Sequence, residues 1–212
     1  MTTTDLAELG LRERKRLATR RAIQVAVLEL LAERGVDGVT VDEISRLADV
    51  SPRTFFNYFA SKEEAMLGDS PELPAQHIID EFLEGTGAVL DDLVTVLKYA
   101  GDKTTADAEM LHLRHQLLKQ FPQLFAMRMA SMRVFEESVG EVVAQRLARD
   151  EPALAADPDR LSSKARLITL VAFATMRHAW TAWAHREPQS LLTDQLTESF
   201  TELKALFSSD PA

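Results

Sequence analysis

Apolar residues recur at three- and four-residue steps along most of the chain, which is the spacing of amphipathic helices. The first such stretch covers about residues 12–34 and ends before Gly35, a residue typical of a C-terminal cap. The same periodicity predicts later helices over residues 74–85, 88–100, 105–120, 122–149, 161–186 and 189–207. Because the sequence has neither strand-like alternation nor an Asn-Gly hairpin signal, the pattern predicts an all-α fold.

Short helices with clear start signals follow the first helix. Thr40 and Glu43 have the spacing of a capping box, in which each side chain bonds to the backbone of the other residue. Ser51 precedes a proline in the first turn of the next helix, and Ser61 opens a further helix. Two short helices joined by a three- or four-residue turn form a helix-turn-helix, which we expect at about residues 41–58.

The second helix of this pair, about residues 52–58, has two unlike sides. Phe55 and Phe59 lie with Pro52 on one side of a helical wheel, and this set is expected to pack inward. The other side carries Arg53, Thr54, Asn57 and Tyr58. Such a side suits a helix that enters the major groove of DNA, where Arg53 either reads guanine or meets only phosphate. The alternative is an ordinary three-helix core with a solvated polar face.

The charge distribution separates the N-terminal region from the rest of the chain. Residues 10–62 hold ten Lys and Arg against seven Asp and Glu, a net charge of +3, whereas the whole chain carries −9. The remainder therefore holds fourteen against twenty-six, a net charge of −12. Basic residues near the start of the first helix are either solvated or contact the DNA backbone: Arg12, Arg14, Lys15, Arg16, Arg20 and Arg21.

Three segments of the N-terminal region, Arg21–Gly35, Thr40–Ala48 and Val50–Glu64, resemble the DNA-binding domain of TetR-type transcriptional regulators. The resemblance implies a homodimer that binds an inverted-repeat DNA operator through a three-helix N-terminal domain. It also implies a C-terminal helical domain that binds a small effector and forms the dimer interface. Members of the family are mostly repressors that leave DNA when the effector binds.

On this basis the expected DNA-binding residues are Thr40, Ser51, Arg53, Thr54, Asn57, Tyr58 and Lys62. Within the family pattern, Lys62 matches a lysine that meets a phosphate. Two positions depart from the pattern. Phe56 stands where family members usually carry a tyrosine, often as a phosphate contact, and Asp49 stands where glycine or alanine is usual.

A stretch rich in proline near residues 68–74 interrupts the helical pattern and marks the expected domain boundary. We therefore expect a DNA-binding domain over residues 1–68 and an effector-binding and dimerisation domain over residues 69–212. The helices at about 161–186 and 189–207 are expected to form half of a four-helix bundle in the homodimer. The alternative is a buried core helix and an amphipathic lid within one subunit.

The effector is expected to be a small hydrophobic molecule, because a cavity for it would be mostly apolar with a few polar groups. The candidate lining residues are Phe82, Tyr99, Met110, His115, Phe125, Met129 and Met132. Such residues at helical spacing are equally typical of a core. The C-terminal part also resembles regulators of the mycofactocin-system type through Arg128, Arg133, Glu136 and Glu137, which implies an acyl or acyl-CoA effector.

An enzyme or a metal site has little support in the sequence. Cysteine is absent, and so are a Gly-rich phosphate loop and a Gly-x-Ser-x-Gly elbow. Glu109 and His112 form one Glu-x-x-His of the kind that di-iron bundles use twice, without a second copy. We therefore expect no enzymatic activity, no cofactor and no metal. The remaining alternative is a helical interaction protein that uses the helix-turn-helix only as a scaffold.

The most apolar stretch, Leu167–Met176, is well short of the roughly 20 residues that cross a bilayer. No apolar run near the N-terminus has the form of a signal-peptide core. These observations, with the absence of cysteine, predict a cytoplasmic protein without a membrane partner.

Overall fold

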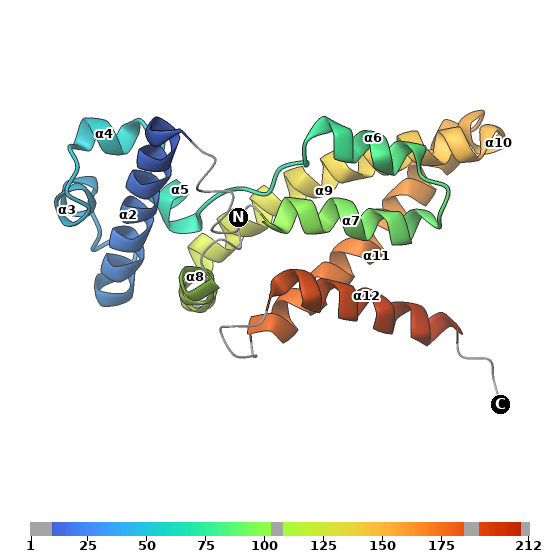
Figure 1. Ribbon diagram of the computed structural model, residues 1–212. Helices are drawn as coiled ribbons and strands as arrows, with labels where there is room; N and C mark the ends of the chain where they lie inside the picture. Colours follow the sequence, from blue (N-terminus) through green and yellow to red (C-terminus); the bar gives the residue numbers. More distant parts are fainter. Residues whose placement is uncertain (1–9, 103–107, 185–190, 209–212) are drawn as a thin grey trace. The chain divides into compact units, whose positions relative to one another are not determined.

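The computed structural model describes residues 10–102, 108–184 and 191–208, and within these ranges it contains helices and no strand (Figure 1). The helices are α2 (Leu11–Arg34), α3 (Val41–Leu47), α4 (Pro52–Phe56), α5 (Lys62–Leu67), α6 (Gln76–Glu84), α7 (Val89–Asp102), α8 (Ala108–Gln120), α9 (Pro122–Asp150), α10 (Pro152–Ala155), α11 (Pro158–Ala184) and α12 (Leu192–Ser208). The prediction of an all-α fold is confirmed. The sequence pattern missed the short helix α10.

The chain divides into two compact units that do not follow a single cut in the sequence. The first unit comprises residues 1–70 and 106–131, and the second comprises residues 71–105 and 132–212. The chain first passes from one unit to the other between residues 70 and 71, close to the boundary expected after residue 68. The sequence pattern did not indicate that residues 106–131 join the N-terminal helices. The functional division into a DNA-binding and an effector-binding domain remains a prediction.

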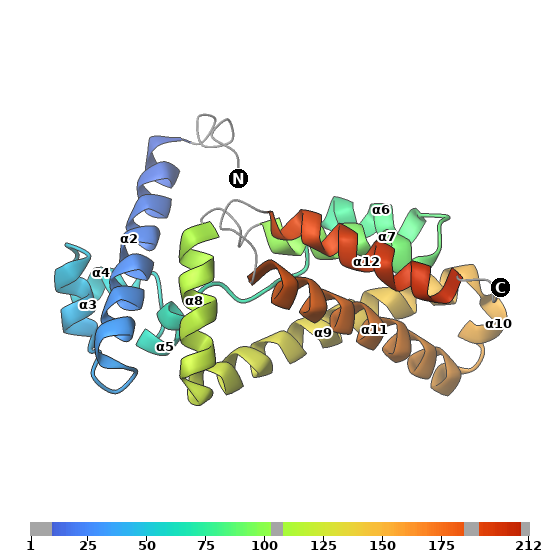
Figure 2. The same cartoon turned by 90° about the horizontal axis from the view of Figure 1, so that it is seen from below.

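The first unit is built around α2, whose buried face meets the short helices. Ile23, Val27 and Leu31 of α2 share one apolar cluster with Ile44 of α3 and with residues of α4 and α5. Helix α8 packs against α2 and α5 (Figure 2). Gly35 ends α2 at a φ of 69°, and its amide donates to the Leu31 carbonyl, as a C-terminal cap does.

The second unit packs α12 against α11 and α7, and α6 against α7 (Figures 1 and 2). Its core contains Phe82, Leu93, Phe173, Trp183 and Phe200, among other buried side chains. The apolar helix α11 buries only part of its surface within the subunit, since the exposed fraction is 63% for Leu167 and 44% for Leu170. In the described part of the chain, no helix combines the length and apolar character that a membrane span requires.

Candidate functional site

Helix α3 begins with the capping box expected from the sequence. The Glu43 amide donates to Thr40 Oγ1 over 3.3 Å, and the Thr40 amide donates to Glu43 Oε2 over 3.2 Å. The hydrogen bonds from Thr40 hold the pKa of the Glu43 carboxyl below its usual value, with a smaller effect from Arg34. Arg34 Nη1 lies 2.5 Å from Glu43 Oε1 and thereby links the end of α2 to the start of α3.

Helix α4 is short and is held at both ends. Ser51 Oγ accepts from the Thr54 amide over 3.0 Å at the start of the helix. Phe55 is fully buried and Phe59 is 2% exposed, so the inward prediction is confirmed for both, whereas Pro52, expected on the same side, is exposed. The helix ends at Phe56, with Asn57 as its C-cap, and so the predicted extent of 52–58 was too long. The Tyr58 and Phe59 amides still bond to the Phe55 carbonyl in the turn that follows.

The expected DNA-binding residues lie close together in sequence, and the structure shows how each is presented. Thr40, Ser51, Arg53 and Asn57 are exposed, while Thr54, Tyr58 and Lys62 are half-buried. The Arg53 side chain makes no hydrogen bond or ion pair with the described part of the chain, so its guanidinium is available to a partner. Phe56 has 56% of its surface exposed beside these polar residues.

Asp49 lies in the turn between α3 and α4 and has a φ of 53°. This left-handed conformation favours glycine, because a Cβ there crowds the backbone. Asp49, which stands where the family usually has glycine or alanine, therefore occupies a position at which glycine would be the least strained residue. Leu47, at the end of α3, is 51% exposed.

Two of the basic side chains considered as DNA contacts, Lys62 and Arg20, also bond to backbone carbonyls within the first unit. Lys62 Nζ donates to the carbonyls of Val36 and Val39, each over 2.8 Å. These bonds fix the loop between α2 and α3 and occupy two of the three ammonium protons. Arg20 Nη1 donates to the Tyr58 carbonyl over 2.8 Å. No local pattern in the chain signals these contacts, because each joins residues more than twenty positions apart.

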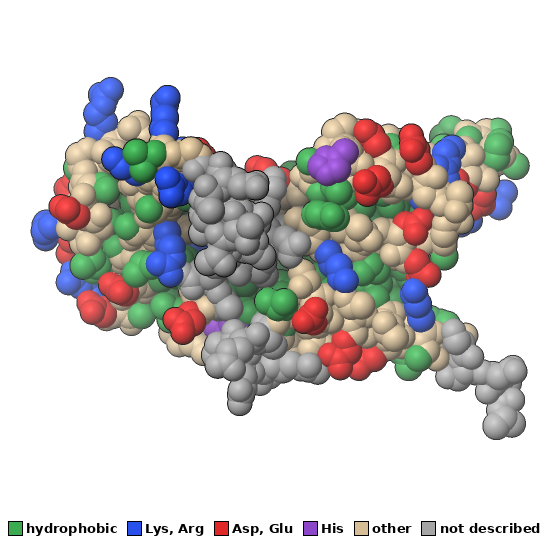
Figure 3. All heavy atoms as spheres, viewed as in Figure 1, with side chains coloured by type: hydrophobic (Ala, Val, Ile, Leu, Met, Phe, Trp, Pro, Cys, Tyr) green, Lys and Arg blue, Asp and Glu red, His purple; other side chains and the backbone are tan. Residues whose placement is uncertain are grey.

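Basic side chains remain exposed at the start of α2 and on α4. Arg12, Arg14, Lys15 and Arg16 are all exposed, and Figure 3 shows blue side chains projecting near the start of α2 and over α4. Arg16 pairs with Glu13 over 2.8 Å, which neutralises part of this charge. A surface that combines free cations with short polar side chains can bind phosphate oxygens and the edges of bases.

The candidate effector residues are not brought together in one unit. Four of them belong to the first unit: Met110, His115, Phe125 and Met129. The other three belong to the second: Phe82, Tyr99 and Met132. Phe82 is 4% exposed and carries the Arg146 guanidinium 5.5 Å from its ring centroid, whereas Tyr99 is 45% exposed. The effector site at these residues stays a prediction.

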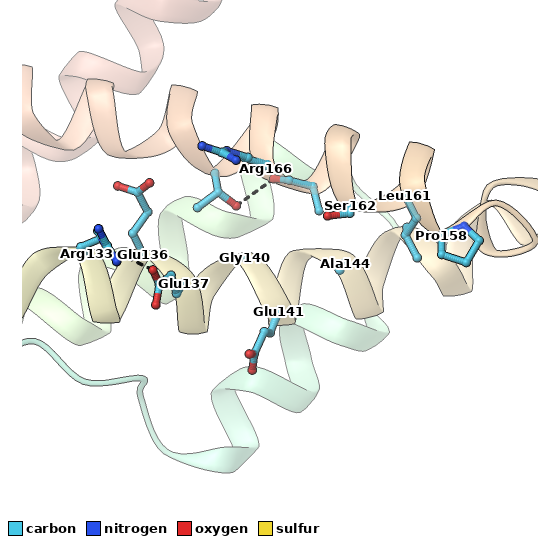
Figure 4. Close-up of a pocket in the computed structure, with 12 residues that line it drawn as sticks. Arg133, Glu136, Glu137, Gly140, Glu141, Ala144, Pro158, Leu161, Ser162 and Arg166 are labelled. Carbon is cyan, nitrogen blue, oxygen red and sulfur yellow. Dashed lines mark hydrogen bonds and ion pairs between the residues drawn. The ribbon is translucent and has the colours of Figure 1, made fainter.

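A cleft of about 550 Å³ lies within the second unit between α9 and α11 (Figure 4). Small residues are part of its lining, among them Gly140, Ala144 and Ala165. Charged side chains border it: Arg133, Glu136, Glu137, Glu141 and Arg166. Arg133 is held by Glu137 over 3.2 Å. The cleft includes three of the four residues that carry the second resemblance noted in the sequence, and none of the candidate effector residues.

No group of three or more His, Asp and Glu side chains is placed to hold a metal ion in the described ranges of the chain. Glu109 and His112 both lie on α8, within the first unit.

Comparison with known proteins identifies relatives of both parts of the chain. A family model described as "Bacterial regulatory proteins, tetR family" matches residues 23–66. A second model, described as the MftR C-terminal domain, matches residues 88–208, which is more than half of the chain. The first match covers the second half of α2, all of α3 and α4 and nearly all of α5, and the second covers most of the acidic remainder.

Individual relatives give the same result. The chain is 47% identical over 58 residues to the HTH-type transcriptional regulator TcmR of Streptomyces glaucescens, covering 27% of this chain and 26% of TcmR. It is 28% identical over 134 residues to the putative mycofactocin biosynthesis transcriptional regulator MftR of Mycobacterium tuberculosis, covering 63% of this chain and 68% of that protein. A solved structure of FadR from Bacillus subtilis in complex with stearoyl-CoA shares the fold, with a TM-score of 0.52 and 20% identity over 86% of this chain and 96% of that one.

Proposed function

Because this chain belongs to the TetR family of bacterial transcriptional regulators, we propose that it is a repressor that binds an inverted-repeat operator as a homodimer. Family membership makes it a DNA-binding regulator and not an enzyme, and it disfavours a mere interaction scaffold. A small hydrophobic effector would release it from DNA. The protein would act in the cytoplasm, where bacterial operators lie.

The observation that carries the proposal is the presentation of α4. Phe55 of α4 and Phe59 in the turn after it are buried, and Arg53 of α4 and its C-cap Asn57 are exposed. Arg53 is suited to the O6 and N7 atoms of guanine, and Asn57 to adenine. Thr40, Ser51, Thr54 and Tyr58 would add contacts to phosphates or sugars.

The hydrogen bonds of Lys62 restrict the phosphate contact that the family resemblance implies for it. Two of its protons are bonded to the Val36 and Val39 carbonyls, and the Glu63 carboxylate lies 4.0 Å from Nζ, so only the third proton is left for a phosphate. We propose that Lys62 mainly fixes the loop before α3 and contacts DNA with that remaining proton.

Selection of bound duplexes from a random-sequence pool tests the operator proposal. The expected result is an enriched inverted repeat, with half-sites about 34–36 Å apart. The Arg53→Ala variant then separates base reading from phosphate contact. A loss of about 1–3 kcal/mol confined to one base position supports base reading. An equal loss over all sequences would leave Arg53 as a phosphate contact.

The dimer is proposed to form through α11 and α12, the helices expected at 161–186 and 189–207. Support comes from apolar side chains that the subunit leaves uncovered, since Leu167, Leu206 and Phe207 are 63%, 75% and 83% exposed. Light scattering at micromolar concentration should give the mass of two chains. The Leu167→Glu variant should shift it toward one chain, and a wild-type monomer would contradict the proposal.

For the effector we propose an acyl-CoA or a related acyl compound. The C-terminal part matches the MftR C-terminal domain, and the fold is shared with a FadR solved with stearoyl-CoA. The candidate contacts are those expected from the sequence: Phe82, Tyr99, Met110, His115, Phe125, Met129 and Met132. Release of the selected operator by stearoyl-CoA, and not by coenzyme A alone, is the expected result. Unchanged operator affinity at saturating acyl-CoA would refute this effector class.

A further inference from the structure

We propose that Asp69, an acidic residue outside the helix-turn-helix, is a positioning residue for operator binding. It acts through Arg20 on the backbone that follows α4. The inference rests on the DNA-binding function proposed above. It concerns which internal contacts keep α4 in the orientation that DNA requires.

Arg20 is the centre of this arrangement. Its Nη1 donates to the Tyr58 carbonyl over 2.8 Å, and its guanidinium carbon lies 4.3 Å from the Phe59 ring centroid. Its Nε donates to Asp69 Oδ1 over 3.1 Å, and its Nη2 bonds to the same oxygen. One planar group on α2 therefore holds both the turn after α4 and the segment after α5. Because the guanidinium is rigid, the carboxylate fixes the direction in which the remaining nitrogen donates.

The segment around Asp69 is itself held in place by the rest of the first unit. Arg128 Nη1 donates to the Asp69 carbonyl over 3.0 Å, and Arg114 Nε donates to the Met66 carbonyl over 3.1 Å. Gly68 has a φ of 74°, and a Cβ there would lie 2.6 Å from the Arg114 guanidinium carbon. Asp69 is thus presented to Arg20 by a backbone with little freedom to move.

The chain leaves the first unit directly after Ser70, whose hydroxyl accepts from the Ser131 hydroxyl over 3.0 Å. The Arg20–Asp69 and Arg20–Tyr58 contacts thus link the last residues of this stretch of the first unit to the backbone that follows α4.

The sign of one mutational effect distinguishes positioning from simple electrostatics. DNA is a polyanion, so loss of a carboxylate near a DNA-binding surface strengthens binding if charge alone matters. If Asp69 positions α4, its loss weakens binding. Glu72 provides a matched control, because it is an exposed carboxylate three residues further on that makes no contact with Arg20.

The test measures operator affinity of the full-length protein at two salt concentrations. We expect Asp69→Ala to bind about fivefold more weakly per protomer, with the salt dependence unchanged, and Glu72→Ala to bind as well as wild type or better. Arg20→Gln should also weaken binding, and adding Asp69→Ala to it should cause no further loss. Wild-type or tighter binding by Asp69→Ala would overturn the proposal. A second result would also overturn it. If the slope of log affinity against log salt became shallower by about 0.9 in Arg20→Gln, Arg20 would be a direct phosphate contact.

A second measurement needs no DNA. The Phe59 amide, which donates to the Phe55 carbonyl, should exchange its hydrogen several-fold faster in Asp69→Ala than in wild type or Glu72→Ala. Equal exchange rates in all three proteins would overturn the positioning role. If wild type binds no duplex at all, the proposed function fails, and this exchange measurement still decides whether Asp69 holds the end of α4.

Discussion

Substitution of Arg146 by methionine should destabilise the second unit more than any exposed charge does. The guanidinium is fully buried, and it bonds to the Phe82 carbonyl, to the Gly87 carbonyl over 3.1 Å and to Asp150 over 2.6 Å. Asp92 lies 3.1 Å away as a second carboxylate partner. One side chain of α9 therefore ties together α7 and the backbone between α6 and α7.

Methionine fills a similar volume but supplies none of these donors. Removal of one partner of a buried ion pair typically costs about 3–5 kcal/mol, because the remaining groups stay desolvated without a counter-charge. Because both carboxylates here are 29% exposed, we expect a cost at the low end, about 3 kcal/mol. This is a large share of the roughly 5–15 kcal/mol that stabilises a native protein. For a chain of this size it corresponds to a fall in Tm of about 6–12 °C.

Thermal and urea unfolding followed by circular dichroism provide the assay, and Arg149→Met is the matched control. Arg149 lies next to the same carboxylate but is 42% exposed, so its loss should cost about 1 kcal/mol or less. Equal destabilisation by the two variants would refute the argument that burial of Arg146 is what makes its contacts strong.

The same ion pair predicts a pH dependence. Hydrogen bonds from Arg146, and then from Arg149, lower the pKa of the Asp150 carboxyl in the folded protein. The stabilisation is therefore present above the unfolded pKa of about 3.9 and is lost as the pH falls through the lower folded value. The stability difference between wild type and Arg146→Met should stay constant near neutrality and narrow below about pH 4. A constant difference down to pH 2 would contradict this assignment.

Two backbone positions give further predictions. Asp49→Gly should raise Tm by about 2 °C, because the strain relieved at the left-handed φ of 53° is larger than the free-energy cost of the entropy that glycine adds to the unfolded chain. An unchanged or lower Tm would contradict this. Gly85→Ala should cost about 1–3 kcal/mol in urea unfolding, because its Cβ would lie 2.6 Å from Asp92 Oδ2 and 2.7 Å from Arg146 Nη1. Gly10→Ala is the control, since nothing lies within 4 Å of its Cβ.

The parts of the fold that the sequence predicted correctly are those set by neighbouring residues. The caps at Thr40, Ser51 and Ser61 depend on a side chain and an amide three positions later, and all three are present in the structure. The inward side of α4 followed from the three- and four-residue spacing of its aromatic residues. Local rules of this kind apply before any tertiary contact forms.

Contacts between distant segments could not be read in the same way. Arg20 and Lys62 belong to a basic region, and only the folded chain shows that backbone carbonyls accept hydrogen bonds from both side chains. Arg146 lies in a helix of ordinary amphipathic pattern, and its carbonyl partner Phe82 is 64 positions away. Methionine and aromatic residues at helical spacing likewise fit either a core or a cavity, so the effector residues had no discriminating signal.

Phe56 offers a direct test of how α4 meets DNA. The ring is 56% exposed and stands edge-on to Phe55, with centroids 5.4 Å apart, so a para hydroxyl would point toward solvent without a desolvation cost. If the exposed side of α4 faces the operator, the Tyr hydroxyl of Phe56→Tyr can donate to a phosphate, and such a bond to a charged acceptor contributes about 1.5 kcal/mol or more.

The expected result for Phe56→Tyr is at least about tenfold tighter operator binding by fluorescence anisotropy, with Tm unchanged. Because the hydroxyl adds no charge, it displaces no counterion, and the slope of affinity against salt should stay the same. An added lysine would raise both affinity and slope, so Phe56→Lys serves as the comparison. Unchanged affinity in the tyrosine variant would mean that this part of α4 lies too far from the backbone for a hydrogen bond. The proposed docking of α4 would then have to be rotated about its axis.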